Sequence, residues 1–106
     1  MPKGWLELDA VLKDRLRVVL DPGCPVAEWE LRKLSEQGRA CSLIVGAELK
    51  RSEQKLAALD ADPASPLIEI ATTFREVNTL RAHLDELHEL LGQLQERAQE
   101  ARAAWL

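Results

Sequence analysis

The stretch that decides the fold lies at residues 77–105 and reads VNTLRAHLDELHELLGQLQERAQEARAAW. Apolar residues recur in it at alternating steps of three and four over four heptads, from Val77 and Leu80 to Trp105. A heptad pattern of this kind is typical of a left-handed coiled-coil seam. The sequence therefore predicts a long helix at about residues 66–105, which must pack against a second helix along its length.

Two breaks divide the rest of the chain. Residues 21–25 read DPGCP and residues 60–66 read DADPASP, and Pro, Gly and Asp in such runs mark turns. Pro also suits the first position of a helix, because its missing N–H would have no partner there. We therefore expect a single helical domain over residues 1–106, with helices at about 5–20, 25–59 and 66–105.

The first two helices differ in how much apolar surface they offer. In the first, one face carries Trp5, Leu8, Leu12, Leu16 and Val19. In the second, one stripe runs through Leu34, Gly38, Cys41, Val45, Leu49, Ser52, Leu56 and Leu59. A second apolar flank, at Val26, Trp29, Ala40, Leu43, Ile44 and Ala47, ends at residue 47. This pattern predicts two neighbouring helices for the first half of the second helix and one for the rest.

Helix lengths lead to the same arrangement. At 1.5 Å per residue the first helix would span roughly 24 Å, against about 52 and 60 Å for the other two. We expect an all-α fold, an elongated antiparallel coiled-coil hairpin with the short N-terminal helix packed on its base. Facing residue numbers should sum to about 46 between the first two helices and about 126 between the last two. Trp5, Trp29 and Trp105 should anchor this base.

The distal end of the hairpin is the predicted partner-binding site. The third helix begins with apolar residues on sides that its seam does not use, and the second helix ends with two leucines nearby: Leu67, Ile68, Ala71, Phe74, Leu56 and Leu59. An exposed apolar cluster of this kind is a candidate interface. The alternative is that Leu67 and Phe74 wrap the arm's own Leu56 and Leu59.

Charge and composition argue against several classes of protein. The net charge is -4, with 14 basic and 18 acidic residues, which is unfavourable for binding nucleic acid through its phosphates. Acidic residues sit among the basic run of Lys50, Arg51 and Lys55. No stretch is apolar enough for a membrane span or a signal peptide, so we expect a cytoplasmic protein with no membrane partner.

Catalytic, cofactor and metal sites are not expected. His83 and His88 lie five residues apart, about 140° around a helix, and cannot bind one metal ion from the same face. Both should be solvated. Cys41 should be a buried, unreactive thiol, and Cys24 a thiol in a turn.

The sequence thus favours a non-catalytic helical interaction module, a subunit or adaptor of a cytosolic assembly that binds protein partner helices through the distal arm. A self-associating homodimeric scaffold or spacer is the alternative. A small helical enzyme or a nucleic-acid-binding protein is a remote one.

Overall fold

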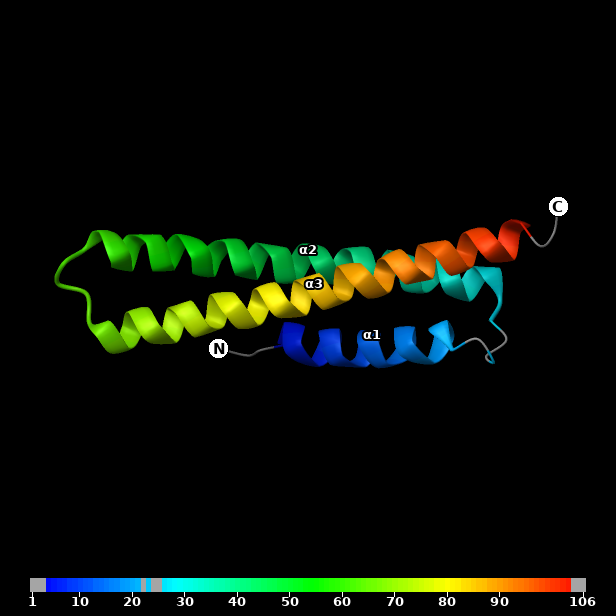
Figure 1. Ribbon diagram of the computed structural model, residues 1–106, viewed down its shortest axis with the longest axis horizontal. Helices are drawn as coiled ribbons and strands as arrows, with labels where there is room; N and C mark the ends of the chain where they lie inside the picture. The colour runs from blue at the N-terminus through cyan, green and yellow to red at the C-terminus, as the bar shows by residue number, and fades with distance from the viewer. Residues whose placement is uncertain (1–3, 22, 24–25, 104–106) are drawn as a thin grey trace.

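The protein is an all-α hairpin of two long helices with a short helix packed on its base (Figure 1). The computed structural model describes residues 4–21, 23 and 26–103, apart from the side chains of residues 5 and 6. Helix α1 spans Gly4–Leu20, α2 spans Glu28–Ala61 and α3 spans Leu67–Ala103. The expected fold is confirmed, although α2 begins at Glu28 rather than near Pro25, because Ala27 has an extended backbone.

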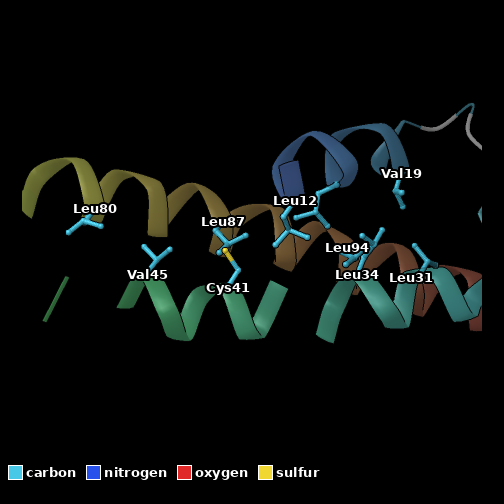
Figure 2. Packing of buried hydrophobic residues seen from close by; sticks show 10 residues of the cluster. Leu12, Val19, Leu31, Leu34, Cys41, Val45, Leu80, Leu87 and Leu94 are labelled. Carbon is cyan, nitrogen blue, oxygen red and sulfur yellow. The ribbon is translucent and has the colours of Figure 1, made fainter. Parts of the chain in front are cut away.

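The predicted coiled-coil seam joins α2 and α3. Figure 2 shows Val45 directed toward Leu80 and Cys41 toward Leu87, with Leu34 beside Leu94. Gly38 permits a close approach of Leu91, because a Cβ at this position would lie only 3.1 Å from Leu91 Cγ. The numbers of this last pair sum to 129, close to the expected 126. The seam extends toward the tip of the hairpin through Val77 and the buried Thr73.

Helix α1 covers only part of the hairpin. It has 17 residues, whereas α2 and α3 have 34 and 37, and the molecule measures 63 × 22 × 18 Å. In Figure 1, α2 and α3 continue well past the N-terminal end of α1. We call this continuation, residues 48–78, the distal arm. The mismatch in helix length that the sequence predicts is therefore present.

The buried face of α1 differs from the predicted one. Leu8 is 47% exposed, whereas Asp9 and Lys13 are buried together with Leu12, Leu16 and Val19. The helix is rotated because a charged pair can be buried when each charge has hydrogen-bonding partners, and α3 supplies such partners here. The spacing of apolar residues alone does not predict which face of α1 is buried.

The second apolar flank of α2 is also not covered as predicted. Leu43 is 75% exposed, Ile44 45% and Trp29 66%. Helix α1 contacts both α2 and α3, because it lies over the groove between them, so it covers the edge of their seam rather than the outer side of α2. Trp29 is therefore not an anchor of the base. The Trp5 side chain and Trp105 lie outside the described residues.

Candidate interaction surfaces and a buried ionic cluster

Four of the six predicted partner-binding residues lie together on the outer side of α3 at the end of the distal arm. Leu67 is 83% exposed, Ile68 78% and Phe74 55%, and Ala71 is exposed between them. We call Leu67, Ile68, Ala71 and Phe74 the tip surface. Monomeric proteins seldom leave several large apolar side chains grouped in water, so this surface is the main candidate for binding.

The other two predicted residues, Leu56 and Leu59, are half-buried on α2. They occupy the seam stripe of that helix, next to Ile70 and Thr73 of α3 in the antiparallel register. Their role is therefore mainly to hold the arm together. The alternative in which Leu67 and Phe74 wrap these two leucines is wrong for Leu67, which is 83% exposed, whereas Phe74 is 55% exposed and thus partly covered.

A buried ionic cluster fastens α1 to α3. Lys13 is 3% exposed and Asp9 1%, and Lys13 Nζ lies 2.9 Å from Asp9 Oδ2. Lys13 also donates to the backbone oxygen of His83 at 2.9 Å and approaches Glu86 Oε2 at 3.4 Å. His83 Nδ1 lies 3.0 Å from the same Asp9 oxygen, so the expectation of a simply solvated imidazole is wrong. Glu86 in turn pairs with Arg17.

The pKa values of Glu86 and Cys41 are shifted within and beside this cluster. Partial desolvation raises the pKa of Glu86, but the charges and hydrogen bonds of Lys13 and Arg17 outweigh it, and the pKa lies below its usual range. Burial, and then the negative charge of Asp9, raise the pKa of the Cys41 thiol. Cys41 is 1% exposed, so the prediction of a buried thiol is confirmed, and its low reactivity stays a prediction.

The cluster does not activate the thiol beside it. A carboxylate beside an imidazole can orient a general base, which acts on a side-chain nucleophile, on water or on a substrate. The nearby thiol of Cys41 is buried and its raised pKa disfavours the reactive thiolate. Asp9 Oδ1 is buried without a hydrogen-bond partner, which makes the carboxylate dependent on the bonds to its other oxygen.

The His, Cys, Asp and Glu side chains and the basic run on α2 bear on metal and nucleic-acid binding. Over residues 4–21, 23 and 26–103, no three His, Cys, Asp or Glu side chains gather closely enough to hold a metal ion. In the basic run on α2, Arg51 Nη1 lies 3.0 Å from Glu48 Oε1, and Glu53 pairs with Arg81 of α3. One of the three basic residues of this run therefore has an acidic partner, whereas Glu53 pairs with a residue outside the run.

A second groove between α2 and α3 runs at the base of the hairpin, on the side that α1 does not cover. Its floor contains Leu31 and Leu94, which are buried, and the half-buried Leu91 and Ala98. Charged side chains form its rim, and Gly92 leaves open space on the α3 side. We call this feature the base groove.

The rim of the base groove carries more positive than negative charge. Arg32 Nη2 and Arg102 Nε both approach the same oxygen of Glu28, at 3.3 and 3.7 Å. Arg39 donates to Ser35 Oγ at 3.4 Å and forms no ion pair with any described residue. Glu36 is the only other acidic residue that lines the groove, against three arginines.

Sequence reasoning missed the buried Asp9–Lys13 pair and the base groove. The i, i+4 spacing of an acid and a base was a signal for the pair, but such pairs are usually solvated. The groove depends on how α2 and α3 meet around Gly92, which no local pattern specifies. No helix in the described part of the chain is long and apolar enough to cross a membrane.

Comparison of the chain with protein-family models, with curated proteins and with solved structures found no match.

Proposed function

We propose that this chain is a non-catalytic helical interaction module, a subunit or adaptor of a cytosolic protein assembly, which binds partner helices through the tip surface. The observation that carries the proposal is the exposure of Leu67, Ile68 and Phe74 at 83%, 78% and 55%. Fully burying an apolar side chain of this size gains about 1.5–3 kcal/mol. A partner that covers all three would therefore gain several kcal/mol.

The position of the tip surface supports the same proposal. It lies on the distal arm, where among the described residues α2 and α3 have only each other to pack against and α1 does not reach (Figure 1). A two-helix coiled coil of this length buries little surface per residue and is expected to be marginal alone. A third or fourth helix from a partner would complete the packing that α1 provides at the base.

Site-specific photocrosslinking in the cells that make the protein tests this proposal. A photoreactive benzoylphenylalanine replaces Phe74, and in a control chain it replaces Gln54, an exposed residue on the other helix of the same arm. Irradiation should give a discrete adduct from position 74 and none from position 54, and Ile68→Asp in the same chain should abolish it. No adduct at position 74, or the same adducts from both positions, would contradict the proposal.

A further inference from the structure

Three of the four tip-surface residues lie on the same face of the hairpin as the base groove, and Ile68, whose heptad equivalents Glu89 and Glu96 do not line the groove, lies beside them. Positions a multiple of seven apart occupy the same side of a coiled-coil helix. On α3, Leu67 and Phe74 share such a position with His88 and Gln95, and Ala71 shares another with Gly92. Helix α1 lies on the other side of α3, where it contacts His83 and Glu86. One open face of the hairpin thus carries an apolar projection at one end and an apolar groove at the other.

We propose that a second copy of this chain covers this face, with the two molecules antiparallel and each tip surface lying in the base groove of the other. The proposal rests on the proposed function and names its partner. Two-fold pairing is the commonest symmetry of soluble oligomers, and in such a pair every contact occurs twice. The four long helices then form a bundle, and both copies of α1 remain on its outside.

Within one chain, the close contact between Gly38 and Leu91 places Gly46 of α2 level with His83 of α3. We place the two-fold axis of the pair at this level, because it brings the tip surface of each copy opposite the base groove of the other. Gly46 lies near the middle of the face, and a Cβ at this position would meet nothing within 4 Å. With the two-fold axis at this level, residues equidistant from His83 face each other across the pair. Phe74 and Gly92 are both nine residues from His83, so the ring meets a position without a side chain.

Charge complementarity supports this register. Asp60 and Arg32 each lie fourteen residues from Gly46 on α2, and Glu53 and Arg39 each lie seven residues from it. The α2 seam shifts by one position between Cys41 and Leu49, so Glu53 and Asp60 occupy the same or the neighbouring helix position as Arg32 and Arg39, on the side of α2 that carries Gly46. Asp60 of each copy therefore faces Arg32 of the other. Arg39, which has no ion-pair partner among the described residues, faces Glu53, which also pairs with Arg81 of its own chain.

The third helix continues the pattern. Arg81 and Asp85 lie two residues on either side of His83 and would pair across the two-fold axis. Over residues 59–74 the chain carries three acidic and no basic residues, whereas three arginines line the base groove. An acidic, apolar tip thus meets a basic, apolar groove in both halves of the pair.

Light scattering on the full chain at increasing concentration tests the pairing. The wild-type mass should rise from 11.9 kDa to twice that value, less readily at high salt. Arg32→Glu alone and Asp60→Lys alone should each weaken pairing by more than about tenfold, because each homodimer places two like-charged pairs in contact. An equimolar mixture of the two variants should recover the wild-type mass, because its two pairs are again of opposite charge.

A steric variant keeps the test independent of charge. Gly92→Leu fills the groove and should leave the chain monomeric, whereas the neighbouring Gln93→Leu, which faces the α1 side, should pair normally. A wild-type chain that stays at one-chain mass at roughly millimolar concentration overturns the proposal. So does a mixture of Arg32→Glu and Asp60→Lys that does not recover the wild-type mass, or a Gly92→Leu chain that pairs normally. If the chain is monomeric but position 74 crosslinks to another protein, the pairing fails and the proposed function stands.

Discussion

Removal of one member of the buried Asp9–Lys13 pair should cost far more stability than removal of both. In Lys13→Met, Asp9 stays 1% exposed with only the His83 ring nitrogen near Oδ2 and no partner at Oδ1. Breaking a buried ion pair in this way typically costs about 3–5 kcal/mol. In Asp9→Leu the loss should be smaller, about 2–3 kcal/mol, because Lys13 keeps the His83 carbonyl at 2.9 Å.

The double variant Asp9→Leu/Lys13→Met should be close to the wild type or more stable, because a well-packed apolar pair replaces two desolvated charges. Urea unfolding followed by far-ultraviolet circular dichroism at neutral pH would give the four free energies of unfolding and their coupling. A coupling of at least about 3 kcal/mol is expected. Single variants that each lose less than about 1 kcal/mol would show that this pair is solvated and that α1 is not docked as described.

Three further predictions follow from the seam and its neighbours. Gly46→Ala should stabilise the chain by about 1 kcal/mol through helix propensity. Gly38→Ala should lower the free energy of unfolding by up to about 2 kcal/mol, because Leu91 must move. Equal changes in the urea midpoint of the two variants would contradict the close contact between Gly38 and Leu91. In a Cys24→Ser background, Cys41 should react with iodoacetamide at least about a hundredfold more slowly in the folded than in the unfolded chain. Comparable rates would show that the base of the hairpin is open to solvent. Glu86 has a lowered pKa, so its stabilisation is complete above the unfolded carboxyl pKa of about 4.3 and is lost as the pH falls through the folded value. The free energy of unfolding of Glu86→Gln should therefore fall less steeply with falling pH than that of the wild type. Identical curves would contradict a stabilising role for ionised Glu86.

Helix content, hairpin topology and the unequal helix lengths were predictable because they depend on periodicities that run over many residues. The seam from Val77 to Leu94 fixes one face of α3 by repetition, so a single unusual residue such as Thr73 does not alter it. The turns were equally legible from clusters of Pro, Asp and Gly. The tip surface followed from the same reasoning, because Leu67, Ile68 and Phe74 lie off the seam where α1 cannot reach.

The rotation of α1 and the exposure of Trp29 were not predictable by the same means. A rotation of the short helix α1 about its own axis exposes Leu8 and buries Asp9. The two orientations differ in free energy by specific bonds to His83 and Glu86 of α3, which is distant in sequence. Position along α2 also does not reveal on which side α1 docks. A tryptophan on an apolar flank was therefore assigned to the base, although two-thirds of it is exposed.

Hydrogen exchange of the dilute chain, read by mass spectrometry of its peptides, tests most directly the claim that the distal arm lacks a cover in the single molecule. Amides at residues 48–78 should exchange faster than those at residues 31–45 and 80–94, which line the base, and should become protected once the tip surface is occupied. Exchange as slow in the arm as in the base, at a concentration where the chain is monomeric, would contradict the account.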